Sequence, residues 1–294
     1  MNVLKDFELC GKKQKVPFIS VIKQGFIIGE ETRQEITRED PKSNKIIFPM
    51  VRGRDITPYS VPSASVYLIG THNGYGNVPP VNVGDYPGIR KWLSPFKKQL
   101  AARSDKGCTI FNLRDCAYWR LFKHPKIMYQ TFQTRPCFIY DENGLFCNNS
   151  MWIIPTDEKW LVGLLNSKMG WWLISKHCTQ IQNGYQLIWE YLGKIPVPRE
   201  EDSTTDGIAV LVDRILAAKK ADPAADTSAL ESEIDALVYQ LYGLTEEEIK
   251  VVEGKDKAAQ EAAVTAAAAP APSRKRSRAA KQAEADEEED EVLE

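Results

Sequence analysis

The sequence predicts an α+β fold in which short, mixed β-strands pack with helices, followed by a helical hairpin and a low-complexity tail. Short apolar runs bounded by glycine, proline and asparagine predict the strands. Apolar residues at helical spacing predict the helices, and the alanine-rich and charged end cannot bury a core. We expect an N-terminal segment at 1–45, a central domain at 46–200, a helical hairpin at 201–254 and a disordered tail at 255–294.

The composition is that of a globular protein, because 43% of the 294 residues are hydrophobic. The six cysteines form no Cys-x-x-Cys pair and have no histidines at zinc-finger spacing, so neither a zinc site nor a disulfide framework is indicated. No apolar run approaches the roughly 18 to 20 residues of a membrane span. The start also lacks the pattern of a signal peptide. We expect a cytoplasmic protein with reduced thiols and no membrane partner.

The charge is distributed unevenly along the chain. Residues 1–200 carry 27 Lys and Arg against 17 Asp and Glu, whereas residues 201–294 carry 11 against 23. A basic globular part suits a polyanion, because cationic side chains release counterions from phosphates. The same surplus is also compatible with ordinary solvated surface.

The first elements are short strands at 18–22 and 25–28, followed by a polar loop or weak helix at 30–44. An apolar strand from residue 46 then ends at Gly53, which lies between Arg52 and Arg54. Arginines on such a turn present a planar fork that matches phosphate or the edge of guanine. The alternative is a structural ion pair of either arginine with Asp55.

A further strand at 66–69 precedes a glycine- and proline-rich segment, and residues 86–103 have a helical pattern. Ile89, Trp92 and Phe96 share one face of that helix. It also carries the cations Arg90, Lys91, Lys97, Lys98 and Arg103. These cations suit contacts with a phosphate backbone, but aromatic docking with the cations in water explains the pattern equally well.

Residues 107–155 alternate short apolar runs with turns, including strands at 126–130 and 138–140. Asp141–Gly144 has the composition of a hairpin turn, from which we expect residues 145–147 to return as the second strand. Residues 160–175 then predict an amphipathic helix. Farther on, 208–220 and 230–242 predict the two arms of a helical hairpin.

A polar loop follows the helix at 160–175. Gln180, Gln182 and Asn183 crowd against Gly184 in this loop, which suits the presentation of hydrogen-bond donors and acceptors to a partner. Amide side chains match the edge of adenine in the major groove of DNA. The Pro196-Val197-Pro198 end then forces an extended exit.

A search for catalytic motifs finds no convincing set. An adenine methyltransferase needs an Asn/Asp-Pro-Pro-aromatic loop for the flipped base, but Asn77-Val78-Pro79-Pro80 has an inserted residue and no aromatic. Gly74-Tyr75-Gly76 is poorly placed for a phosphate loop. His72, His124 and His177 are isolated from any nucleophile.

A magnesium nuclease needs paired carboxylates and a lysine that activates water. Asp157-Glu158-Lys159 has the Asp-x-Lys form, but such triplets are common by chance. We therefore expect neither catalytic residues nor metal ligands in this chain.

A series of motifs resembles a known family, the TaqI-like C-terminal specificity domain. These motifs are Phe48–Ile56, Tyr86–Ile89, Asn112–Arg114, Pro125–Gln130, Leu164–Lys168, Gln182–Tyr185 and Ile195–Pro198. The helix ending in Leu237–Leu244 also resembles the segment that follows this domain in the family. The resemblance covers residues 45–250 and lies in the whole series of motifs.

The resemblance implies a function in target recognition. That family forms the target-recognition end of adenine-specific DNA methyltransferases and of single-chain type IIG restriction-modification enzymes. The methyltransferase half has no counterpart here, so S-adenosylmethionine is expected in a catalytic partner and no cofactor in this chain. The expected partners are double-stranded DNA and an adenine methyltransferase domain or subunit.

These observations lead to one main hypothesis and two alternatives. The main hypothesis is a non-catalytic module for sequence-specific DNA recognition, in which the cations of 86–103 hold the backbone. The residues expected at base edges are Arg52, Arg54, Arg114, Gln180, Gln182 and Asn183. The alternatives are a subunit that docks a methyltransferase and a free-standing magnesium nuclease.

Overall fold

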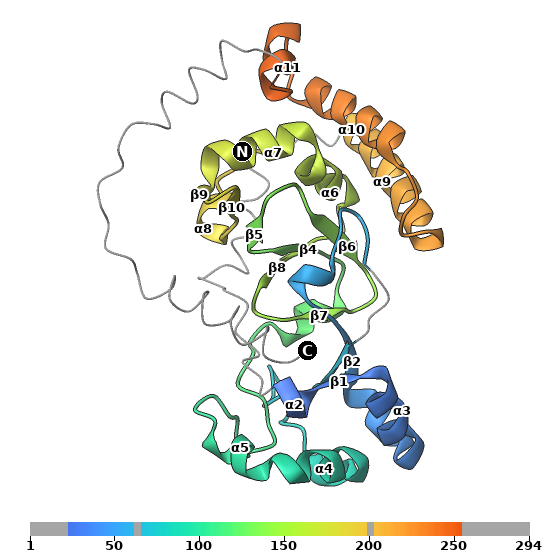
Figure 1. Ribbon diagram of the computed structural model, residues 1–294, viewed down its shortest axis with the longest axis vertical. Helices are drawn as coiled ribbons and strands as arrows, with labels where there is room; N and C mark the ends of the chain where they lie inside the picture. Colours follow the sequence, from blue (N-terminus) through green and yellow to red (C-terminus); the bar gives the residue numbers. More distant parts are fainter. Residues whose placement is uncertain (1–22, 62–65, 199–202, 255–294) are drawn as a thin grey trace, which may run out of the picture. The chain divides into compact units, whose positions relative to one another are not determined.

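The computed structural model describes residues 23–61, 66–198 and 203–254 (Figure 1). The expected strand at 18–22 and the expected tail at 255–294 lie outside these residues. The chain divides into two compact units, Met1–Thr245 and Glu246–Glu294. In the second unit, the described residues form helix α11 (Glu246–Val252).

The first sheet of the larger unit has the strand order β1-β3-β2-β7. Strands β1 (Ile27–Gly29), β3 (Val66–Ile69) and β2 (Ile47–Val51) are antiparallel neighbours, and β7 (Phe146–Cys147) adds to β2 in parallel. The strands expected in the runs beginning at residues 46 and 66 are thus confirmed. The strand expected at 25–28 is confirmed over Ile27 and Ile28 of β1, whereas residues 25 and 26 end a short helix, α2 (Lys23–Phe26).

Helices cluster around this first sheet, where Ile28, Met50 and Leu68 are buried. The polar segment expected as a loop or weak helix forms a helix of ten residues, α3. The helices of this part of the chain, in which η marks a 3₁₀ helix, are α3 (Glu30–Glu39), η2 (Pro41–Ile46), η3 (Gly53–Asp55), η4 (Val83–Asp85), α4 (Pro87–Leu93), η5 (Ser94–Phe96) and α5 (Lys97–Ala102).

The single helix expected at 86–103 is therefore interrupted. The 3₁₀ segment η5 contains Pro95, whose backbone nitrogen cannot donate a hydrogen bond to the preceding turn. The apolar face nevertheless packs as expected. Leu93 and Leu100 are fully buried, and the indole nitrogen of Trp92 donates to the carbonyl of Gly25 at 2.8 Å.

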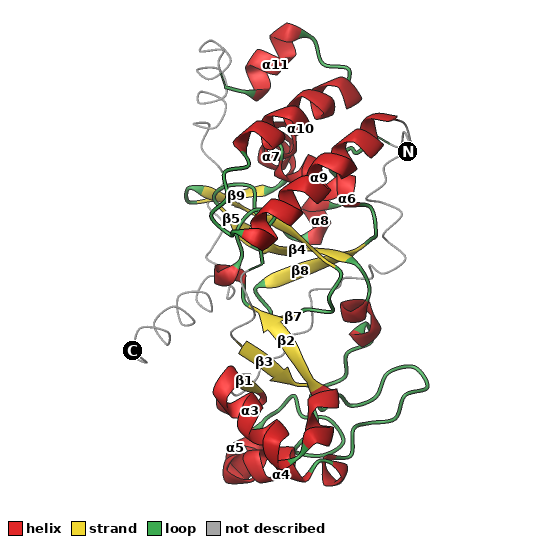
Figure 2. Cartoon of the chain, turned by 90° about the vertical axis from the view of Figure 1, so that its right-hand side faces the viewer, coloured by secondary structure: helices red, strands yellow, loops and turns green. Residues whose placement is uncertain are grey.

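A second, antiparallel sheet has the order β6-β4-β8 and is drawn in yellow in Figure 2. Its strands are β4 (Lys126–Gln130), β6 (Phe138–Asp141) and β8 (Met151–Pro155). The strands expected at 126–130 and 138–140 are confirmed. The 3₁₀ helix η6 (Trp119–Lys123) lies just before β4 in the chain.

The prediction of a β-hairpin around Asp141–Gly144 is wrong. The chain turns there, with Gly144 at a φ of 78°, but β7 pairs with β2 of the first sheet and not with β6. The Asp141 carboxylate organises the turn, because it accepts from the backbone nitrogens of Asn143 and Leu145 at 3.0 and 2.9 Å. Phe146 then packs on Phe48 of β2 with a centroid distance of 4.8 Å, so an aromatic contact accompanies the pairing of β7 with the first sheet.

The helix expected at 160–175 is confirmed as two helices, α6 (Lys159–Asn166) and α7 (Lys168–His177). Ser167 separates them, because its hydroxyl accepts from the backbone nitrogen of Gly170 at 3.0 Å and so caps α7. A side chain at Gly170 would collide with the carbonyl of Leu164.

The helical hairpin is confirmed as α9 (Ser203–Ala221) and α10 (Ser228–Leu241). It packs on α6, where a Cβ added to Gly163 would lie 2.7 Å from the Ile208 side chain. The hairpin thus belongs to the same compact unit as the sheets. The boundary at 200/201 stays a prediction. Within the described residues, no helix has both the length and the apolar character needed to cross a bilayer.

Candidate nucleic-acid interface

The polar loop expected after the helix is a β-hairpin. It consists of β9 (Thr179–Ile181) and β10 (Gly184–Gln186), which pair in antiparallel fashion around a two-residue turn of Gln182 and Asn183. Strand β5 (Phe132–Gln133) pairs with β10, so the sheet order is β5-β10-β9. All residues from 179 to 183 are exposed. The hairpin therefore brings the three amide residues of the sequence prediction together on one projecting element.

The base of this hairpin is anchored by backbone contacts. The nitrogen of Leu187 donates to the carbonyl of Thr131 at 2.7 Å, and the nitrogen of Thr131 donates to the carbonyl of Ser150 at 2.8 Å. Gly184 is buried, and an added Cβ would collide with the carbonyl of Gln133. The short helix α8 (Trp189–Leu192) follows in the chain. An anchored base with an exposed tip keeps the amide side chains in a defined position.

Gln182 has a backbone conformation that non-glycine residues rarely adopt. Its φ is 51°, and Asn183 is not among the residues with positive φ. Positive φ at only the first central residue is the pattern of a type II′ turn, in which that position usually holds glycine. Non-glycine residues at positive φ cost stability and concentrate at binding and active sites. The positive φ of Gln182 therefore marks it as a candidate functional residue.

The two faces of the hairpin have different surroundings. Gln180 is the cross-strand partner of Tyr185, and the Tyr185 ring meets the Trp171 ring of α7 edge to face at 5.3 Å. The side chain of Ile181, the next residue of the strand, points to the opposite face of the hairpin and is 38% exposed. One face is therefore packed by aromatics, and the tip and edge strand remain open.

The two arginines after β2 have separate environments. The Nε atom of Arg52 lies 2.6 Å from the Asp55 carboxylate, which is the structural pair considered as the alternative. Arg54 is exposed, and Gly53 between them packs close to Gln130 and Ser150. This pair gives Arg52 a structural role, and base contacts by Arg52 or Arg54 stay predictions.

Four of the five helical cations are exposed on α4 and α5, namely Arg90, Lys91, Lys97 and Lys98. Lys91 also pairs with Glu39 of α3 at 2.8 Å, although both side chains are more than half exposed. An exposed pair of this kind contributes little and is easily replaced by another anion. These side chains are available for phosphate contacts, and that role stays a prediction.

The fifth cation, Arg103, is buried, with an exposed fraction of 8%. Its guanidinium donates to the carbonyls of Ile110 and Asn112 at 3.0 and 2.8 Å and lies over the Phe26 ring at 4.9 Å. Burial lowers the pKa of this guanidinium. Arg103 therefore holds the 103–112 loop, and this geometry does not support the expected DNA contact.

In the Asn112-Leu113-Arg114 motif, the first two residues make structural hydrogen bonds and the third is exposed. Asn112 is buried, and its amide nitrogen donates to the carbonyl of Val81 at 2.9 Å. The nitrogen of Leu113 donates to the carbonyl of Thr71 at 2.9 Å. Arg114 is exposed and stays a candidate contact.

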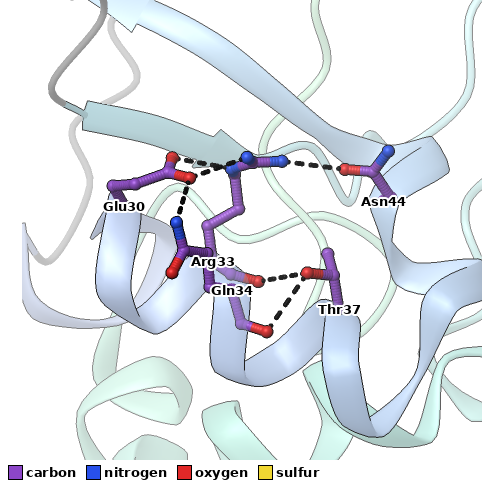
Figure 3. Close-up of polar contacts among 5 residues, drawn as sticks. All are labelled: Glu30, Arg33, Gln34, Thr37 and Asn44. Atoms are coloured by element: carbon purple, nitrogen blue, oxygen red, sulfur yellow. Dashed lines mark hydrogen bonds and ion pairs between the residues drawn. The ribbon is translucent and has the colours of Figure 1, made fainter.

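Ion pairs neutralise other cations of the described chain. Figure 3 shows Arg33 of α3, whose Nε and Nη2 atoms each lie 2.8 Å from the Glu30 carboxylate and whose Nη1 donates to Asn44 at 3.2 Å. Hydrogen bonding by Arg33 lowers the pKa of Glu30 to about 2. Lys159 of the Asp-x-Lys triplet pairs with Asp213 of α9 at 2.7 Å, so its amine is already engaged. The described residues contain no group of three or more metal-ligating side chains.

Sequence reasoning missed two features near the start of β4. Lys126 and Asp141 form a fully buried ion pair, with exposed fractions of 0 and 1%. Arg120 and Lys123 are exposed on η6. The only available signal was the alternation of aromatic and basic residues in 118–123.

The chain matches a known protein family. The family described as the TaqI-like C-terminal specificity domain matches residues 48–197, which is about half of the sequence. The chain belongs to this family. Apart from β1 and Ile47 of β2, the match includes the strands of all three sheets, and so it includes the hairpin β9–β10.

Solved structures resemble this specificity domain. The type IIL restriction-modification enzyme MmeI, solved in complex with DNA, matches with a TM-score of 0.57 and 13% identity over 76% of this chain and 31% of that chain. The type IIG restriction endonuclease BpuSI matches with a TM-score of 0.42 and 11% identity over 81% and 32%. The MmeI match shows a shared fold. The present chain thus spans about a third of the length of each.

Proposed function

We propose that this chain recognises a specific sequence in double-stranded DNA as part of a restriction-modification system. The observation that carries the proposal is the recognition hairpin β9–β10. Three amide residues lie on its exposed part, and its base is anchored inside a specificity domain. A two-stranded β-ribbon fits the major groove of DNA, where glutamine and asparagine make bidentate contacts with adenine.

In this proposal the exposed cations and the amide residues make different kinds of contact with DNA. Phosphate contacts position a protein on the duplex, whereas base contacts determine the sequence that it selects. In the proposed arrangement Arg90, Lys91, Lys97 and Lys98 hold the backbone. Gln180, Gln182 and Asn183 read bases, and Arg54 and Arg114 are available for either kind of contact.

We further propose that catalysis belongs to an adenine-N6 methyltransferase partner, with or without nuclease activity as in type IIG systems. That domain or subunit would bind S-adenosylmethionine, and this chain would hold no cofactor of its own. We also propose a cytoplasmic location, which suits the free thiols of the five described cysteines.

A docking subunit of a methyltransferase is the second candidate. In that candidate the helical hairpin would contact the partner, and Val210 of α9, which is 59% exposed, would lie in the interface. Salt separates the two candidates, because phosphate contacts weaken steeply with salt and an apolar interface does not.

The test is selection of bound sequences from a pool of random duplex DNA at two salt concentrations. The unaltered chain is expected to enrich a short motif. A Gln182→Ala, Asn183→Ala variant should lose preference at one position or two adjacent positions, with a loss of about 1 to 3 kcal/mol per contact. Absence of DNA binding at both salts would refute the proposal. An unchanged motif in the variant would exclude the hairpin as its reader.

A further inference from the structure

The 3₁₀ helix η6 presents two cations side by side. Arg120 and Lys123 are three residues apart, and side chains at this spacing lie above one another in a 3₁₀ helix. Both are exposed. We call them the η6 cation pair.

Aromatic rings hold the η6 cation pair. The Arg120 guanidinium lies 5.6 Å from the centre of the Tyr75 ring, and the Lys123 ammonium lies 5.8 Å from the centre of the Phe48 ring. Both rings contact Trp119, with centroid distances of 6.4 and 6.0 Å. A cation over an aromatic face is oriented by the ring but keeps its full charge.

The loop before η4 also approaches Arg120 closely. Gly76 has a φ of 55°, and an added Cβ would lie 2.7 Å from the Nη2 atom of Arg120. Tyr75 and Val78 pair with each other across this turn, with both N–H···O distances at 3.0 Å. The turn and the ring therefore restrict the guanidinium from two sides, which reduces the entropy that it would lose on binding.

The charges of the η6 cation pair are not neutralised by an acidic side chain of the described residues. In the described part of the chain neither side chain has a carboxylate within ion-pair distance, whereas Arg33 and Lys91 do. His72 packs against Trp119 at 5.3 Å, and burial together with the nearby charge of Lys123 lowers the pKa of its imidazole. An anion bound across both cations would be attracted by each of them.

We propose that the η6 cation pair is a contact site for the phosphate backbone of duplex DNA. This inference rests on the proposed function and adds a backbone contact outside helices α4 and α5. Exposed, oriented cations suit a polyanion that lies across the surface. Arginine and lysine at this spacing would each neutralise one phosphate.

The test measures the salt dependence of duplex binding for the full chain and for an Arg120→Gln, Lys123→Gln variant. Each phosphate contact contributes about 0.9 to the slope of log Kd against log salt, so the variant should lose about 1.8. If both proteins bind equally at 1 M salt, this corresponds to roughly 60-fold weaker binding at 0.1 M. The loss should be the same for every DNA sequence.

Two control variants separate a local contact from a general charge effect. Arg214→Gln, Lys220→Gln removes two exposed cations of α9 and should retain the slope. Arg120→Lys, Lys123→Arg keeps both charges and should also retain most of it. Thermal unfolding should be similar in all of these proteins, because the substituted side chains are exposed.

Three results would overturn the inference. An unchanged slope in the Gln variant, with normal binding by the unaltered chain, would remove the η6 cation pair and leave the proposed function intact. An equal loss in the α9 variant would show that net charge and not position matters. Failure of the unaltered chain to bind DNA at any salt would overturn the proposed function and this contact together.

Discussion

Replacing Lys126 by methionine should strongly destabilise the larger unit. The Lys126 amine is fully buried and donates to the Asp141 carboxylate and, at 2.7 Å, to the carbonyl of Phe122. Without the amine, Asp141 would keep a buried negative charge whose other partners are the backbone nitrogens of Asn143 and Leu145. Removal of one member of a buried pair costs about 3 to 5 kcal/mol.

The expected loss for Lys126→Met is about 4 kcal/mol, a large part of the stability of an average domain, which is roughly 5 to 15 kcal/mol. Urea unfolding followed by tryptophan fluorescence measures it as a shift of the midpoint. Burial lowers the pKa of Lys126, which means that desolvation opposes the charged form.

A double-mutant cycle tests this reasoning. Because desolvation opposes the pair, the double variant Lys126→Met, Asp141→Asn should lose at least about 2 kcal/mol less than the sum of the two single variants. A loss below about 1 kcal/mol in Lys126→Met, or strict additivity in the cycle, would refute the assignment of a coupled buried ion pair.

Three other predictions concern residues at or near the surface. Gln182→Gly should relieve the positive φ and leave stability unchanged or higher by up to about 1 kcal/mol, while sequence preference in DNA selection weakens; a large loss of stability would contradict this. Lys97→Gln, Lys98→Gln should lower the salt slope of DNA binding by about 1.8 without changing the selected motif, and an altered motif would contradict a backbone role. The lowered pKa of Glu30 means that its pair with Arg33 stabilises the fold above the unfolded pKa, near 4.5, and that this contribution disappears as the pH falls towards about 2. Thermal unfolding at pH 6 and pH 2.5 should therefore differ less in Glu30→Gln than in the unaltered chain, and an equal difference would contradict it.

Elements with a strong apolar pattern could be predicted from the sequence. The strand at 66–69 was found as a short, continuous apolar run, and the arms of the helical hairpin were found because their buried residues recur at helical spacing. The strand β9 was missed because every one of its residues is exposed, so it has no apolar alternation. Its strand structure depends on β10 and, through it, on β5, which only the fold reveals.

The candidate site was predictable only in part. The residue types at 180–183 indicated a polar contact surface, and the structure exposes them. For other candidate residues, the hydrogen-bond and ion-pair partners seen in the structure determine the role. Arg52 and Arg103 looked like the other basic candidates in the sequence, but the guanidinium of Arg52 pairs with an aspartate and that of Arg103 donates to two backbone carbonyls. Such pairings depend on distances that a local pattern does not contain.

Photo-cross-linking from the tip of the recognition hairpin tests the central claim most directly. One protein carries a photoreactive amino acid at position 182, and a second carries it at the exposed position 210 of α9. With an enriched duplex bound, the account predicts cross-links to DNA bases from position 182 and none from position 210. Cross-links from position 210 alone, or none from position 182 while DNA stays bound, would contradict recognition through this hairpin.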